Sequence, residues 1–192
     1  MSGGVVSLER RIDQLEARAE IEALAHLYCR AMDEQDPVLL ETLFTPESRV
    51  ISDNGWMDGE GGRDGVVRMY RNFWTTLGAT FHWMHGVQIV FDENDPDAAT
   101  GMVMGHAETY RDPKTATYLI AMRYEDRYRR DAGRWKYAER NVSMLYFCLP
   151  GEYNDILGSA LRMTVRGKGE MADWPENKPG WKTFGQWPGV LA

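Results

Sequence analysis

The residue types best suited to acid–base chemistry in this sequence are a histidine and an aspartate far apart in the chain. His82 falls in a stretch that favours a strand, and Asp33 falls at the end of a helical pattern. An imidazole accepts and returns a proton near neutral pH, provided that a carboxylate fixes its tautomer and stabilises its charged form. A carboxylate at a helix C-terminus is disfavoured by the helix dipole unless a cation lies nearby. We therefore predict an Asp33–His82 pair; the alternatives are a solvated helix end and a structural histidine.

Two further polar residues are candidates for holding a leaving group or a developing negative charge. Arg140 lies in the middle of an expected strand, where a buried guanidinium would bind an oxyanion. Its alternatives are an ion pair with Glu139 or a surface position. Tyr28 precedes Asp33 on the same expected helix and could donate a hydrogen bond or a proton, or simply belong to the core.

The remaining motifs give little support to metal, nucleotide or nucleophilic chemistry. His82 and His85 are three positions apart on an expected strand and would point to opposite faces, which is poor geometry for a shared zinc ion. No glycine-rich phosphate loop follows a strand, and there is no Gly-x-Ser-x-Gly elbow. We expect neither a metal nor an organic cofactor.

Helical periodicity precedes strand periodicity along the chain. Helices are expected over residues 8–33, 39–44 and 64–77, and strands over 47–52, 79–91, 98–110, 115–130 and 134–147. Strict alternation along 79–91 would place on one face, with His82, the residues Met84, Gln88 and Val90. Helices followed by an antiparallel meander predict an α+β protein, with a ligand site between the helices and the curved sheet.

Length and composition limit the number of domains and the classes of partner. The 192 residues suit one domain, with its core over about 8–148 and a tail, 149–192, that wraps or caps it. Seven Trp, nine Tyr, six Phe and eleven Met indicate either a large aromatic core or a pocket for a flat apolar ligand. A net charge of −7 without a basic block argues against nucleic acid, and no apolar run is long enough for a membrane helix. With only Cys29 and Cys148, and no secretory segment, the cytoplasm is the expected compartment.

Taken in order, these residues resemble the SnoaL-like branch of the nuclear transport factor 2-like superfamily. The likeness covers about residues 8–148 and is carried by 19–33, 81–91 and 128–136, followed by Arg140. Similar members include hexachlorocyclohexane dehydrochlorinase, bile acid 7α-dehydratase and scytalone dehydratase. The resemblance implies a cone-shaped barrel in which a curved antiparallel sheet wraps around N-terminal helices, and many members are trimers.

The same resemblance implies site roles and a range of reactions. The family's Asp–His pair falls on Asp33 and His82, the dehydrochlorinase's arginine on Arg140 and the bile acid enzyme's tyrosine on Tyr28; His85 is the alternative base. We expect a cofactor-independent lyase that eliminates water, or formaldehyde by C–C cleavage, from a hydrophobic aromatic or diaryl substrate. The alternatives are an isomerase or polyketide-type cyclase, and a non-catalytic subunit of a dioxygenase. The residues expected to contact the substrate are Trp83, Met84, His85, Met104, His106, Tyr118 and Met122.

Overall fold

Three helices precede the long strands in the computed structural model, which describes residues 7–111, 116–165 and 169–175. Helix α1 (Leu8–Asp33) begins after Ser7, whose side chain accepts a hydrogen bond from the backbone N–H of Arg10. Helix α2 (Pro37–Thr42) begins where the Asp36 carboxylate accepts two backbone N–H groups and Pro37 occupies the first turn. Helix α3 covers Gly62–Trp74.

The strands form one sheet with the order β2-β1-β6-β5-β4-β3. Strands β3 (Leu77–Phe91), β4 (Ala98–Arg111), β5 (Ala116–Asp131) and β6 (Arg134–Cys148) make the expected antiparallel meander. Strand β1 (Phe44–Ser52) pairs with β6 in parallel and with the two-residue β2 (Asp58–Gly59) in antiparallel orientation. The parallel pair was not predicted, because hydrophobic periodicity carries no information about strand direction.

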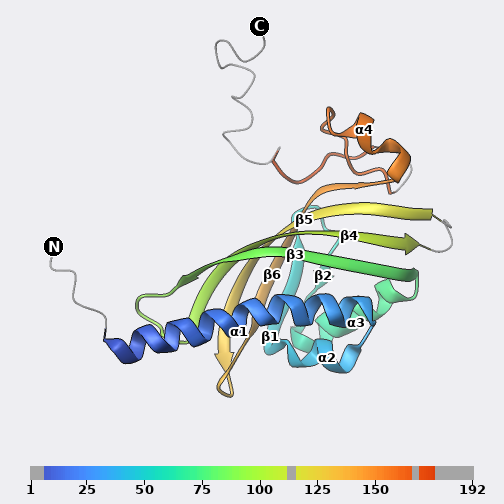
Figure 1. Ribbon diagram of the computed structural model, residues 1–192. Coiled ribbons are helices and arrows are strands. Elements are labelled where there is room, and N and C mark those ends of the chain that lie inside the picture. The colour runs from blue at the N-terminus through green and yellow to red at the C-terminus, as the bar shows by residue number, and fades with distance from the viewer. Residues whose placement is uncertain (1–6, 112–115, 166–168, 176–192) are drawn as a thin grey trace, which may run out of the picture.

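The three helices lie on one side of the curved sheet (Figure 1). Helix α1 packs mainly on β3 and also contacts β6, whereas α3 covers β1 and β2. Residues of α1 such as Ile21 and Leu24 belong to the same buried core as inward side chains of the sheet such as Val103. The α+β architecture with a curved sheet around N-terminal helices is therefore confirmed. Its edge strands, β2 and β3, stay at opposite ends of the strand order, so the sheet curls without closing.

The boundary between α2 and β1 differs from the prediction. Residues 39–44 were expected to be helical, but the helix ends at Thr42 and Phe44 begins the strand. The backbone carbonyl of Leu43 accepts a hydrogen bond of 2.9 Å from the N–H of Tyr137 in β6. That long-range pairing draws the chain into the sheet one turn earlier than local propensity suggests.

A bulge in β3 changes which side chains face inward. Pairing with β4 shifts between Met84 and Val87, where β3 carries one residue more than its partner. An extra residue inverts the alternation. As a result Gln88 and Val90 are exposed and Ile89 is buried, so the predicted grouping of Gln88 and Val90 with His82 is wrong.

The described part of the tail packs beyond the end of β6 (Figure 1). It contains a 3-10 turn, Pro150–Glu152, and the short helix α4 (Tyr153–Ile156). The buried Arg162 donates hydrogen bonds to the backbone carbonyls of Leu145, Ser159 and Trp174 and ties the tail to the sheet. Residues 176–192 lie outside the described part, so the full extent of the predicted cap stays a prediction.

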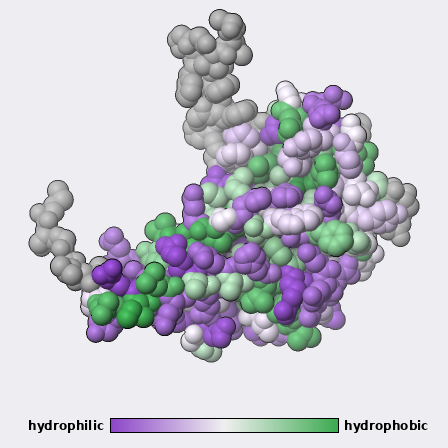
Figure 2. All heavy atoms as spheres, in the orientation of Figure 1, coloured by the Kyte–Doolittle hydropathy of each residue, from purple (hydrophilic) through white to green (hydrophobic). Residues whose placement is uncertain are grey.

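The first turns of α1 project past the sheet with their apolar side chains in solvent. Leu8, Ile12 and Leu15 are 65%, 47% and 67% exposed, and Figure 2 shows apolar side chains gathered there. Helical spacing thus predicted the helix without predicting burial. Across the described ranges, no helix combines the length and the apolar character needed to cross a bilayer.

Candidate active site

A cavity of about 380 Å³ lies between the helices and the inner face of the sheet. Helices α1 and α3, strands β3 to β6, the turn after β1 and the tail residue Val165 all contribute to its wall. The wall is mostly apolar and carries four methionines. Its aromatic side chains are Tyr28, Trp56, Tyr70, Phe73, Tyr124 and Phe147. Part of the unusual aromatic and methionine content therefore surrounds a space of ligand size.

Asp33 and His82 meet at the edge of this cavity. Asp33 Oδ1 lies 2.6 Å from His82 Nδ1, and Asp33 Oδ2 accepts the backbone N–H of His82 at 3.1 Å. Both carboxylate oxygens of Asp33 thus contact His82, one at the imidazole ring and one at the backbone of β3. These two contacts fix the ring relative to its strand. Their side chains are 26% and 11% exposed, respectively.

The elements explain why two residues so distant in sequence come together. Asp33 is the last residue of α1, which packs along β3, and His82 lies on the inward face of β3 before the bulge. His82 lines the cavity and Asp33 does not, so Nδ1 is turned toward α1 and Nε2 is left on the cavity side. With Asp33 ionised, Nδ1 carries the hydrogen and Nε2 is the basic nitrogen. This arrangement is suited to exchanging a proton with a bound molecule.

Tyr28 brings a phenol to the same cavity. Its hydroxyl lies 2.8 Å from the hydroxyl of Tyr70, and both residues line the wall. Burial raises the pKa of Tyr28, and the charge of Arg140 opposes that rise only in part. The phenol is therefore protonated at neutral pH and able to donate a hydrogen bond.

Arg140 lies behind this wall rather than in it. The side chain is completely buried, and its Nε and Nη2 each donate at 2.8 Å to the carboxylate of Asp126. The guanidinium carbon lies 4.2 Å from the ring centres of Tyr28 and Tyr124 and 4.1 Å from that of Tyr137. Burial alone would lower the pKa of Arg140, but the Asp126 carboxylate raises it well above its usual value. The aromatic rings separate this fixed cation from the cavity.

Comparison with known proteins identifies the family. The family model of the SnoaL-like domain matches residues 13–141. This chain belongs to the SnoaL-like domain family. The resemblance found in the sequence is therefore confirmed. No curated protein sequence matches the chain.

Solved structures show how far the SnoaL-like fold extends over this chain. A type 2 hexachlorocyclohexane dehydrochlorinase superposes with a TM-score of 0.67 at 22% identity, covering 72% of this chain and 92% of its own. A candidate scytalone dehydratase from Novosphingobium aromaticivorans gives 0.61 at 20% identity, with 73% and 90% covered. A nuclear transport factor 2-like protein from Salmonella enterica gives 0.61 at 18% identity, with 68% and 92% covered. At these identities the likeness establishes a shared fold.

The substrate contacts predicted for this SnoaL-like domain divide between the two faces of the sheet. Met122 lines the cavity; Tyr118 is buried on the same face of β5 without lining it, and Met84 packs at the edge of the core. Four others belong to the outer face, where they alternate with inward residues, so they do not line the cavity as expected: Trp83, His85, Met104 and His106.

The outer histidines interact with each other and not with Asp33. His85 Nε2 lies 3.0 Å from His106 Nδ1, and the His106 ring stacks on Trp83 with centres 5.1 Å apart. Of the two histidines left open as the base, only His82 faces the cavity. Side-chain parity on the strand separates them, because residues an odd number of positions apart point to opposite faces.

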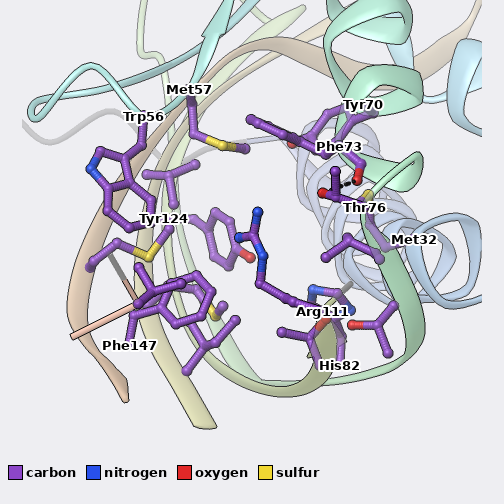
Figure 3. Close-up of a pocket in the computed structure, with 18 of the residues that line it drawn as sticks. Met32, Trp56, Met57, Tyr70, Phe73, Thr76, His82, Arg111, Tyr124 and Phe147 are labelled. Carbon is purple, nitrogen blue, oxygen red and sulfur yellow. Dashed lines mark hydrogen bonds between the residues drawn. The ribbon is translucent and has the colours of Figure 1, made fainter. Parts of the chain in front are cut away.

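Arg111 is a cavity residue that the sequence analysis did not identify. It ends β4 on the inward face that also contains Val103, Ala107 and Thr109. In Figure 3 its side chain extends into the middle of the ring of labelled lining residues. The available signal was an arginine directly after the expected strand 98–110, continuing a run of small and apolar residues at every second position.

No cluster suited to a resident metal ion occurs in the part of the SnoaL-like domain that the structure describes. Nowhere in residues 7–111, 116–165 and 169–175 do three or more His, Cys, Asp or Glu side chains come together as ligands. The expectation that the protein works without a metal or a cofactor stays a prediction.

The two cysteines should react slowly in the folded protein. Burial, assisted by the charge of Asp33, raises the pKa of Cys29 from 9.0 to about 11, and burial and Glu152 raise that of Cys148 to about 11. Such a rise lowers the thiolate fraction at pH 8 about a hundredfold. Alkylation by iodoacetamide, followed by mass spectrometry, should therefore be slow until urea unfolds the chain. Rapid labelling of either thiol in the native protein would contradict their burial.

Proposed function

We propose that this protein is a small-molecule lyase in which Asp33 and His82 act as an acid–base pair, without a metal or organic cofactor. The observation that carries the proposal is the 2.6 Å contact between Asp33 Oδ1 and His82 Nδ1 beside an apolar cavity that His82 lines. A general base needs a fixed tautomer, a stabilised charged form and access to the substrate. The two hydrogen bonds that the Asp33 carboxylate accepts from His82 support the fixed tautomer and the stabilised charge, and the cavity supports access to the substrate.

In the proposed reaction, Nε2 of His82 takes a proton from the substrate and Asp33 stabilises the resulting imidazolium. If the proton comes from carbon, the electron pair forms a double bond and a hydroxyl departs as water. If the proton comes from a hydroxymethyl group, its C–O bond becomes the carbonyl of formaldehyde as the adjacent C–C bond breaks. The remaining fragment keeps the electron pair of that bond and takes up a proton at carbon. The mostly apolar wall strengthens each of these electrostatic interactions.

Tyr28 is proposed as the proton donor to the leaving group. Its raised pKa keeps the phenol protonated, and it lines the same cavity as His82. Arg140 is then a positioning residue, since its guanidinium contacts the Tyr28 ring and does not line the cavity. Of the two residues expected to assist the leaving group, this assignment gives the direct contact to Tyr28 and places Arg140 behind it.

The proposed substrate is a hydrophobic aromatic molecule with more than one ring, such as a diaryl compound. Six aromatic side chains and four methionines around a cavity of about 380 Å³ support this class. The shared fold with a hexachlorocyclohexane dehydrochlorinase and a candidate scytalone dehydratase is compatible with elimination chemistry. Trimer formation and a cytoplasmic location remain predictions.

Product mass tests the reaction type. Purified protein, assayed with and without a chelator, should convert diaryl 1,3-diols or fused-ring hydroxy-ketones to products lighter by one water or one formaldehyde, detected by liquid chromatography–mass spectrometry. A new product of unchanged mass would support the isomerase or cyclase alternative instead. An absence of turnover across both substrate classes, together with co-purification with an iron-containing oxygenase, would support the non-catalytic alternative.

A further inference from the structure

Arg111 places a partly exposed guanidinium in a mostly apolar cavity. It ends β4 with its side chain turned inward, and the guanidinium reaches toward the centre of the space (Figure 3). Its guanidinium carbon lies 5.7 Å from the centre of the Phe147 ring. Such a contact offsets only part of the cost of removing a guanidinium from water.

The protein supplies no counter-charge to Arg111 within the described ranges. The cavity wall contains no aspartate, glutamate or lysine, and no described carboxylate forms an ion pair with this arginine. By contrast, the fully buried Arg140 has a bidentate carboxylate partner. Burial lowers the pKa of Arg111, yet an arginine remains charged at neutral pH. Arg111 therefore presents to the cavity a guanidinium that the anionic group of a ligand can pair with.

A second polar group without a partner lies beside Arg111. Thr109 is two residues earlier on the same face of β4, lines the cavity and is 3% exposed. Its hydroxyl has no hydrogen-bond partner among the described residues. Thr80, on the neighbouring strand β3, pairs with Thr109, and the Thr80 hydroxyl donates a hydrogen bond to the backbone carbonyl of Glu108. Arg111 and Thr109 thus form a set of hydrogen-bond donors near the strand position of His82.

We propose that Arg111 binds an anionic oxygen that the substrate already carries, a carboxylate or a phenolate on an aromatic ring. The planar guanidinium forms paired hydrogen bonds with a carboxylate and a charge-assisted bond with a phenolate, and the apolar wall holds the ring. Binding at this point orients the rest of the molecule toward His82. The inference names the substrate class for the proposed lyase and rests on that function only for the orientation, not for the binding.

Matched ligands test the charge selectivity without any turnover. Isothermal titration calorimetry should show that biphenyl-4-carboxylate binds about ten- to a hundredfold more tightly than biphenyl-4-carboxamide, because a charge-assisted bond replaces a neutral one. A separate series with 4-hydroxybiphenyl should show tighter binding as pH rises through the ionisation of the free phenol. The carboxylate series and the phenol series distinguish the two sources of the anionic oxygen.

Variants assign the selectivity to this residue. Arg111→Gln should abolish the preference for carboxylate, Arg111→Lys should restore part of it, and Thr109→Val should weaken carboxylate binding only a few-fold. Arg127→Gln is the matched control, since that arginine lies on β5 with its side chain 72% exposed and should leave both affinities unchanged. Circular dichroism and the unfolding midpoint would verify that each variant is folded.

Two outcomes would overturn the inference: equal affinity for carboxylate and amide in the wild type, or a carboxylate preference that survives Arg111→Gln. Either result leaves the acid–base pair untouched. Conversely, a preference lost in Arg111→Gln combined with normal turnover in His82→Ala would support the anion site and contradict the lyase mechanism. The two proposals can therefore fail separately.

Discussion

Asp33→Asn and His82→Ala should each lower kcat by at least about a hundredfold, which is typical of positioned acid–base groups. Alanine removes the proton acceptor. The asparagine variant keeps the shape but changes the hydrogen bonding, because Asp33 accepts both the ring N–H and the backbone N–H of His82. An amide has one acceptor oxygen and one NH2 group, so it satisfies only one of these donors. Either the imidazole changes tautomer or the strand loses its anchor.

The measurement is steady-state kinetics on the substrate found by the mass screen, with two controls. Glu34→Gln changes the neighbouring exposed carboxylate, and His85→Ala removes the histidine on the outer face; both should retain kcat within a few-fold. Ligand affinity measured by calorimetry should stay close to wild type in His82→Ala, which separates lost chemistry from lost binding. Turnover near wild type in either dyad variant, with the fold intact, would remove the mechanism.

Arg140→Met should lower the free energy of unfolding by about 3–5 kcal/mol, the cost of breaking a buried ion pair by removing one partner. The loss arises because Asp126 is left buried without the two bonds from Nε and Nη2, and Tyr137 loses the N–H that reaches its hydroxyl. Three aromatic rings also lose the cation between them. The effect should be on stability first and on turnover second.

Urea unfolding followed by far-ultraviolet circular dichroism measures this loss. The double variant Arg140→Met/Asp126→Leu should recover a large part of it, because no buried charge then remains unpaired. Arg127→Met, on the exposed side of β5, should change stability by less than about 0.5 kcal/mol. If the single Arg140 variant unfolded with the same midpoint as the control, the ion pair would not be a principal stabilising contact.

The local hydrophobic pattern of the sequence predicted the positions of most helices and strands. The period of apolar residues predicted a helix over 8–33 and strands over 98–110 and 134–147, and each lies within a residue or two of its position in the structure. These elements depend on backbone propensity and on one buried face, both of which are encoded in neighbouring residues. Residue chemistry suggested the pairing of Asp33 with His82, and motif order in the resembling family strengthened it, since no local rule links residues so far apart.

Tertiary structure decided which residues share the cavity. One extra residue in β3 inverted the faces beyond Met84, and strand parity could not say which face of β4 met the helices until the sheet was formed. The orientation of β4 places Met104 and His106 on the outer face and turns Arg111 toward the cavity. The packing of α1, β5 and β6 encloses Arg140 between three tyrosines. The residue type determines the intrinsic chemistry of a side chain. Its environment depends on residues distant in sequence, which come near only in the folded chain.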